Sequence, residues 1–176
     1  MKKYALLPLL LLGLSLQFST TLISQKLSQE KKIESIMQLA KFIDWSGNTQ
    51  FSDSKRIIYV LTDAKSSKNY EIKEKNDQKY KNWQIICMDK IKDIESGSVV
   101  FITNEQQKQA IEVIELSTRK DILTISENAD KFCSKGGMIN MVEYDEKFRF
   151  EINYRIIQNK SLNISSKILA LAKIYD

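Results

Sequence analysis

Histidine is absent from all 176 residues of the sequence, and this absence excludes more chemistry than any other feature of the composition. Histidine is the usual general base near neutral pH, a member of the Ser-His triad and the commonest zinc ligand. The two cysteines alone would leave a metal site incomplete. The sequence therefore predicts no histidine-based catalysis, no metal and no cofactor.

Glycine and proline are also scarce, with five glycines and a single proline, Pro8. The turn after the apolar run Ser98–Ile102 contains no glycine, so it fits neither the dinucleotide-binding fingerprint nor the phosphate-binding loop. Hydrolysis by two carboxylates stays open because acidic residues are plentiful. Only Glu151 stands in a context that suggests burial, so we expect that the protein is not an enzyme.

The first 24 residues have the pattern of a secretory signal peptide. Lys2 and Lys3 precede an apolar run, Tyr4–Leu16, which small and polar residues follow. The run is shorter than the ~20 apolar residues that a membrane-spanning helix needs. An uncleaved anchor that extends to Ile23 is the alternative, although it would place Gln17 and several hydroxyl groups in lipid. We predict a signal peptide over residues 1–24 and a periplasmic location for the rest.

Residues 25–176 have the size of one domain with a single core. The formal net charge of +5 falls to +3 when Lys2 and Lys3 are removed (5 − 2 = 3). The remaining lysines alternate with acidic residues, which indicates a solvated mixed surface and no nucleic-acid partner.

The two cysteines, Cys87 and Cys133, leave two interpretations open. Export would permit a disulfide between them, but both could equally be small buried hydrophobic residues. The sequence does not give the Cα separation that a disulfide requires. A catalytic thiol is disfavoured because no histidine is present to activate it.

The spacing of apolar residues predicts the secondary structure. Apolar residues recur every three or four positions over 30–45, which predicts a first helix. A second helix, capped by Thr103 or Asn104, would follow the third strand, with Ala110, Ile111, Val113 and Ile114 facing inward. Short runs rich in β-branched residues predict strands at Arg56–Thr62, Trp83–Cys87, Ser98–Ile102 and Asp121–Ser126.

The C-terminal part predicts an antiparallel hairpin of Met138–Tyr144 and Phe148–Ile152, a short helix capped by Asn153, and a last helix over Ser165–Tyr175. Glu151 would tie down neighbouring N–H groups or pair with Arg149. A strand, a helix and another strand at this spacing imply parallel pairing. We therefore expect a single α/β domain, with a small, mostly parallel sheet, flanking helices and a C-terminal antiparallel hairpin.

Two further patches have a structural and a functional interpretation. Phe42 and Trp45 lie beside the apolar stripe of the first helix, where they either cap the core or anchor a partner. Gly136 and Gly137 precede a predicted strand, where they either make a turn or line an anion-binding loop. The structural interpretation is favoured for both patches.

Taken together, these segments resemble the YfiR-like family of periplasmic regulators over about residues 30–174. The resemblance rests on a KFIDW element, a GGMI element, an FRFEIN element and a final SSKILALA helix. Ser46 stands where the family has proline after the tryptophan. Cys133 is the only cysteine near the glycine pair, so the local bridge of some relatives cannot form. The family-signature residues are Phe42, Trp45, Gly136, Gly137, Phe150, Glu151, Asn153 and Ser166.

The resemblance implies a non-catalytic protein that binds the periplasmic domain of an inner-membrane signalling protein. In the best-known case that protein is a diguanylate cyclase, whose restraint lowers cyclic-di-GMP and biofilm formation. A homodimer is compatible with this role. The alternative function is a small-ligand sensor, whose site would lie at the carboxyl ends of the parallel strands, near Thr62-Asp63, Thr103-Asn104 and Ser126-Glu127.

Overall fold

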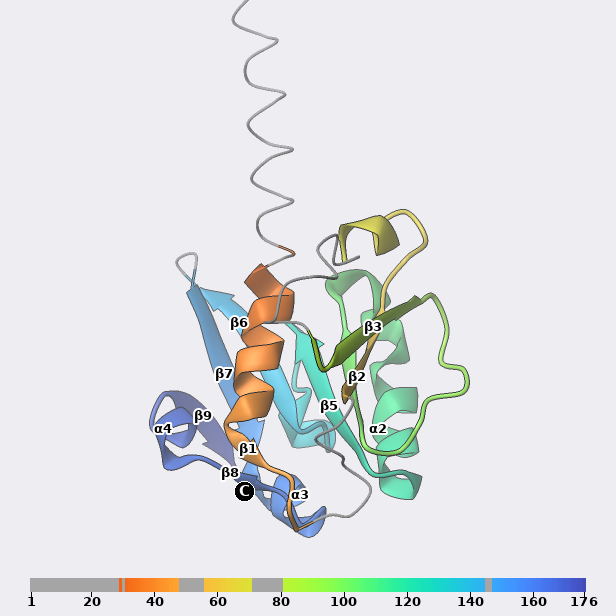
Figure 1. Cartoon of the computed structure of the whole chain (residues 1–176). Coiled ribbons are helices and arrows are strands. Elements are labelled where there is room, and N and C mark those ends of the chain that lie inside the picture. The colour runs from red at the N-terminus through yellow and green to blue at the C-terminus, as the bar shows by residue number, and fades with distance from the viewer. Residues whose placement is uncertain (1–28, 30, 48–55, 71–80, 145–146) are drawn as a thin grey trace, which may run out of the picture.

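The apolar runs of the sequence form one mixed sheet in the computed structural model of the chain (Figure 1). The structure describes residues 29, 31–47, 56–70, 81–144 and 147–176, and within them the sheet has seven strands in the order β3-β2-β4-β5-β6-β7-β9. The strands are β2 (Arg56–Leu61), β3 (Trp83–Met88), β4 (Ser98–Ile102), β5 (Ile122–Glu127), β6 (Ile139–Tyr144), β7 (Lys147–Asn153) and β9 (Ala172–Tyr175).

Strands β2 to β6 pair in parallel, β6 and β7 form the antiparallel hairpin, and β9 adds to β7 in parallel. Helices lie on both faces of this sheet. They are a helix over residues 31–41 (the N-terminal helix), η1 (Ser67–Asn69), η3 (Asn104–Gln109), α2 (Ala110–Arg119), η4 (Cys133–Lys135), α3 (Tyr154–Asn159) and α4 (Ser166–Leu169). The predicted α/β fold, with its parallel strands and C-terminal hairpin, is confirmed.

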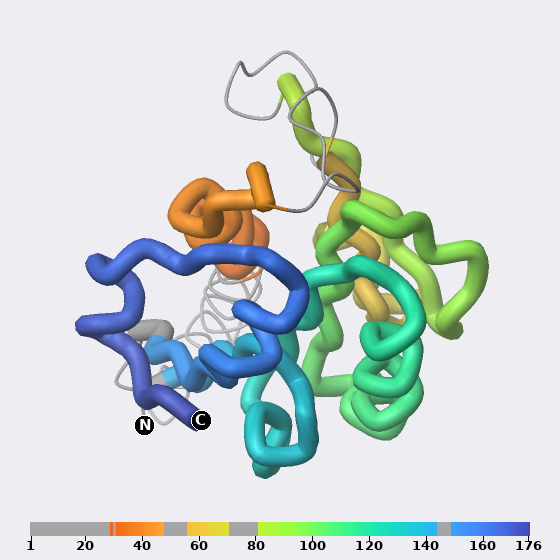
Figure 2. The backbone as a smooth tube through the Cα atoms, turned by 90° about the horizontal axis from the view of Figure 1, so that it is seen from below, coloured from red at the N-terminus to blue at the C-terminus, as the bar shows by residue number. Residues whose placement is uncertain are grey.

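The N-terminal helix covers one face of the sheet, and α2 covers the other (Figure 2). Alternate residues along each strand supply the two cores, because successive side chains of a strand point to opposite faces. On β4, for example, Phe101 packs toward the N-terminal helix and Val100 toward α2. The central strands are buried on both sides, which explains their continuous apolar sequence.

The first predicted helix ends earlier than expected. It stops at Lys41, and the chain then forms a two-residue strand, β1 (Ile43–Asp44), that pairs with β8 (Asn163–Ile164). This small ribbon joins the N-terminal helix to the C-terminal segment.

The helix after β4 also differs from the prediction. It begins as the 3-10 helix η3, and the side chain of its N-cap residue, Thr103, makes no capping hydrogen bond. Val113 and Ile114 are buried as predicted, and Ala110 is half-buried. The prediction for Ile111 is wrong, since 51% of this side chain is exposed. Once the helix turns Val113 and Ile114 to the sheet, Ile111 falls outside the stripe.

The last predicted helix is the clearest error. Only Ser166–Leu169 is helical, and Ala172–Tyr175 forms β9. The spacing of Ile168, Leu171 and Ala172 fits a helix, but the edge of β7 offers a ladder of unpaired backbone groups. Ala172 pairs with Phe150 on that edge, while Leu171 remains 68% exposed.

Candidate functional site

A surface pocket lies on the polar face of β6, β7 and β9, beside the loop after β5. Its volume is about 450 Å³. The lining residues are Asn128, Ala129, Asp130, Lys131, Asn140, Val142, Glu151, Lys173 and Tyr175. They carry charges of both signs, which suits recognition of a polar surface.

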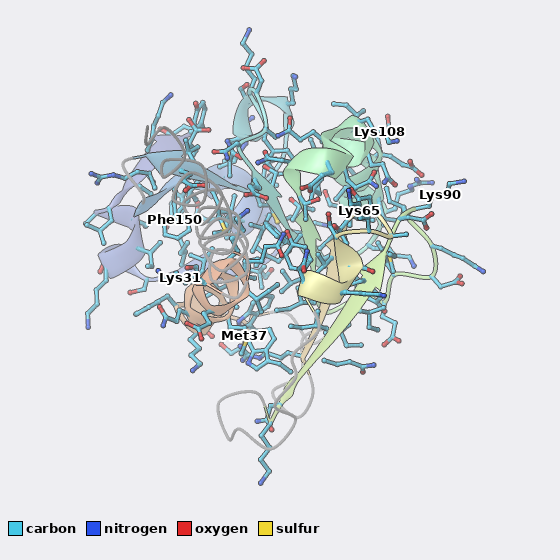
Figure 3. The ribbon with its side chains drawn as sticks, turned by 90° about the horizontal axis from the view of Figure 1, so that it is seen from above. Lys31, Met37, Lys65, Lys90, Lys108 and Phe150 are labelled. Carbon is cyan, nitrogen blue, oxygen red and sulfur yellow. The ribbon has the colours of Figure 1, made fainter. Side chains whose placement is uncertain are left out.

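The period of β7 places Glu151 in this pocket. Phe150 and Ile152 pack toward the N-terminal helix, so Glu151 points to the opposite face (Figure 3 labels Phe150 on the helix side). On that face Glu151 accepts hydrogen bonds from Asn140 Nδ2 at 2.8 Å and from Tyr175 Oη at 3.1 Å. Lys173 Nζ lies 3.5 Å from the same carboxylate.

These partners differ from the predicted ones. Glu151 does hold neighbouring donors, but they belong to side chains, and its ion-pair partner is Lys173 on β9. Its expected pairing with Arg149 does not occur among the interactions of Glu151 that the structure describes. The spacing of apolar residues predicted a helix where β9 forms. Lys173 and Tyr175 were therefore not predicted as neighbours of Glu151.

Asn140 is the centre of the hydrogen-bond network and was missed by the sequence analysis. Its Oδ1 accepts from Ser126 Oγ at 2.8 Å and from the Ala129 N–H at 3.1 Å. Its Nδ2 donates to the Ala129 carbonyl at 3.1 Å and to Glu151. Only 2% of Asn140 is exposed, so all four bonds are sheltered from water. An asparagine between the apolar residues Ile139 and Met141 was the available signal.

The glycine pair shapes the turn that leads into β6. Gly136 has φ of 102°, a left-handed conformation that favours glycine. A Cβ on Gly137 would overlap the buried ring of Phe132. The backbone conformation at Gly136 and the packing at Gly137 therefore both favour glycine, which supports the turn interpretation.

Asn153 fastens the same turn to the end of β7. Its Nδ2 donates to the Cys133 carbonyl at 2.8 Å, and its Oδ1 accepts from the Ile156 N–H at 3.0 Å. The second bond caps α3, as the sequence predicted. The turn, the hairpin and α3 are therefore held by one side chain.

A scan against family models matches residues 29–173 to the YfiR/HmsC-like family. The chain belongs to the YfiR/HmsC-like family. No curated protein gives a significant sequence match. The match begins with the N-terminal helix and ends within β9, so it includes both the core and the pocket.

The residues on which the sequence resemblance rests do not form a single site. Gly136, Gly137, Glu151 and Asn153 cluster around the turn and the pocket, as described above. Phe150 is half-buried against the core of the N-terminal helix. Ser166 is exposed at the start of α4, where the preceding Ser165 provides the cap.

Trp45 is a core residue and Phe42 is not. Trp45 is 7% exposed, its Nε1 donates to the Ala40 carbonyl at 2.9 Å, and the Arg56 guanidinium lies over its ring at 5.5 Å. Phe42 is 40% exposed, and its carbonyl accepts from the Ser165 N–H at 2.8 Å. The core interpretation therefore applies to Trp45 alone, while the aromatic face of Phe42 remains open to solvent.

The disulfide considered from the sequence is absent from the structure, where Cys87 and Cys133 are not joined to each other. They pack on opposite faces of the sheet, Cys87 toward the N-terminal helix and Cys133 toward α2. Burial, together with the nearby Glu151 carboxylate, raises the pKa of the Cys133 thiol to about 12. This thiol is therefore a neutral core group with little thiolate at pH 7.

No group of three or more His, Cys, Asp or Glu side chains that could hold a metal occurs in the part of the chain that the structure describes. None of the helices described there is long and apolar enough to cross a membrane. The pocket itself presents an ionic network whose members already hold one another, which suits binding of a partner through its rim.

We predict that Asn140→Ala lowers the free energy of unfolding by about 2–3 kcal/mol, because it leaves the buried Ser126 hydroxyl and the Ala129 backbone without hydrogen-bond partners. Urea denaturation of the exported chain measures this loss. Asn159→Ala is the matched control, since Asn159 is exposed at the end of α3 and should change stability little. Equal stability of the two variants would contradict the central role of Asn140.

We also predict that the native protein reacts with a thiol reagent at Cys87 only, whereas denaturation without a reductant releases a second thiol, Cys133. Cys87 is half-buried on the edge strand β3, whereas Cys133 is completely buried. Titration with an aromatic disulfide, followed by absorbance, gives the number of reactive thiols in the native and in the denatured protein. The Cys87→Ser variant should show no reactive thiol until it unfolds. A denatured wild-type chain with no free thiol would show that a disulfide exists after all.

Proposed function

We propose that this protein is a non-enzymatic periplasmic regulator that binds and restrains an inner-membrane diguanylate cyclase. The observation that carries the proposal is the family match, which covers residues 29–173. The signal-peptide pattern of residues 1–24 supports export, and the absence of histidine removes the commonest catalytic groups. Homodimerisation stays a prediction.

Restraint of a cyclase requires a difference in affinity between its two states. A regulator that binds the inactive state more tightly shifts the population toward that state. A shift from 1% to 99% inactive requires about 5.5 kcal/mol of differential binding. A rigid surface provides this more effectively than a mobile one, because less entropy is lost on binding.

The pocket beside Glu151 is the contact surface that we propose. Its walls belong to three adjacent strands, and the Asn140 carboxamide fixes them to the loop after β5. Lys131 is exposed on that loop, and Lys173 is 67% exposed on β9. A partner with acidic groups at matching positions would meet these two ammonium groups at the rim, where charges mainly set the rate and specificity of association.

Deleting the gene should raise cyclic-di-GMP in the native host, because the cyclase loses its restraint. Mass spectrometry of cell extracts measures the nucleotide. The full-length gene should restore the original level, and the same gene without codons 2–24 should not, since its product would stay in the cytosol. Unchanged cyclic-di-GMP in a deletion strain that expresses the cyclase would contradict the proposal.

A further inference from the structure

A cluster of polar side chains lies at the carboxyl ends of β2, β4 and β5. The next residues after β2 and β4, and the last residue of β5, are Thr62, Thr103 and Glu127. They are neighbours, because Leu61 pairs with Ile102 and Ile102 with Ser126, and the Thr103 N–H donates to the Leu61 carbonyl at 3.1 Å.

All three side chains point toward the N-terminal helix. The residues two positions earlier, Val60, Phe101 and Ile125, belong to the core on that face. The exposed fractions of Thr62, Thr103 and Glu127 are 1%, 0% and 2%. The apolar interface between helix and sheet therefore ends here in a buried polar layer.

The first turn of the N-terminal helix supplies the other half of the cluster. Lys32 Nζ lies 2.5 Å from Glu127 Oε1, with 13% of the lysine side chain exposed. Gln29, three residues before Lys32 in the sequence, is 7% exposed. Figure 3 looks down on this end of the molecule, where Lys31 marks the first turn of the helix and Lys65 and Lys108 mark the segments after β2 and β4.

The hydrogen-bonding capacity of this cluster is unfilled. Four buried side-chain atoms of the described residues have no hydrogen-bond partner, and all four are here: Gln29 Oε1, Thr62 Oγ1, Thr103 Oγ1 and Glu127 Oε1. Glu127 Oε1 has the Lys32 ammonium as its ion-pair partner, so the oxygens that lack any partner are Gln29 Oε1, Thr62 Oγ1 and Thr103 Oγ1. Buried polar groups of native proteins are nearly always paired, so three unpaired oxygens beside one buried ion pair need an explanation.

The topology of the sheet supplies one. The connection after β2 packs on the side of the N-terminal helix through Tyr70, while the connection after β4 continues into α2 on the other face. Connections that leave adjacent strands toward opposite faces create the usual ligand position of open α/β sheets. Burial and the charge of Glu127 raise the pKa of Tyr70, so this side chain also lies near the cluster as a neutral hydroxyl.

The charges and the hydrogen-bonding atoms of the cluster indicate which class of ligand it would bind. Lys32 and Glu127 cancel each other's charge, and a charged ligand would have to separate this buried pair. Gln29 Oε1 only accepts hydrogen bonds, whereas the Thr62 and Thr103 hydroxyls both donate and accept, so the ligand must offer donors and acceptors together, as a hydroxyl group does. We propose that Gln29, Lys32, Thr62, Thr103 and Glu127 bind a small neutral polyhydroxyl compound between the N-terminal helix and the sheet.

This site goes beyond the proposed regulatory function, because a ligand bound there would control the state of the regulator. A ligand that contacts Gln29 and Lys32 on one side and Thr62 and Thr103 on the other would clamp the first turn of the helix to the sheet. Ligand occupancy would then determine how firmly the N-terminal helix is held.

The test uses the purified exported chain with ribose, glucose and glycerol as probes. We expect that at least one of them raises the melting temperature at millimolar concentration in a saturable manner, and slows amide exchange in residues 31–41. The Thr62→Val/Thr103→Val variant should lose both effects. Thr118→Val, on the exposed side of α2, should keep them. If the double variant does not fold, Gln29→Leu replaces it and should also lose both effects.

Polyols also stabilise proteins by exclusion from their surface, but that effect does not saturate and would be equal in all variants. The proposal is wrong if no probe gives a saturable shift, if the double variant and Thr118→Val respond alike, or if acetate or ethylamine saturates the site in place of the polyols. Each of these results concerns binding to the purified chain, so it is independent of the cyclic-di-GMP measurement in cells.

Discussion

The carboxamide of Asn140 is the interaction on which the C-terminal half of this domain depends. It makes four hydrogen bonds, to β5, to the loop after β5 and to β7, in a position that is 2% exposed. A side chain with two donors and two acceptors satisfies all of these groups at once, which a hydroxyl or an aliphatic group could not do. Through Glu151 the network extends to Tyr175 on β9. The shape of the pocket therefore follows from this one amide.

The turn before β6 and the carboxyl ends of β2, β4 and β5 differ in how they are packed. Close packing fixes the turn before β6, where Gly137 accommodates the Phe132 ring and Asn153 joins the turn to α3. The carboxyl ends of β2, β4 and β5 are different, because a polar layer there separates the start of the N-terminal helix from the sheet. A closely packed surface loses less entropy when it binds a partner. A layer of buried polar groups without partners can gain hydrogen bonds from a ligand.

The sequence predicted what local periodicity controls. The strand runs, the hairpin and the Asn153 cap were found because each depends on residues close together in the chain. The errors concern long-range partners. Ala172–Tyr175 has helical spacing but pairs with the edge of β7, and the role of Asn140 depends on Ser126 and Glu151, which are distant in sequence. Cys87 and Cys133 were left open because only the assembled sheet shows that they face opposite cores.

Direct binding to the periplasmic domain of the proposed partner, a diguanylate cyclase, tests the account most directly. Titration of that purified domain with the wild-type chain should give a saturable complex, and the Lys131→Glu/Lys173→Glu variant should bind at least about tenfold more weakly, a change of about 1.4 kcal/mol. Lys90→Glu, an exposed change in the β3–β4 connection, should bind like the wild type. Absence of a complex, or equal affinity of all three chains, would contradict a regulator that acts through the pocket beside Glu151.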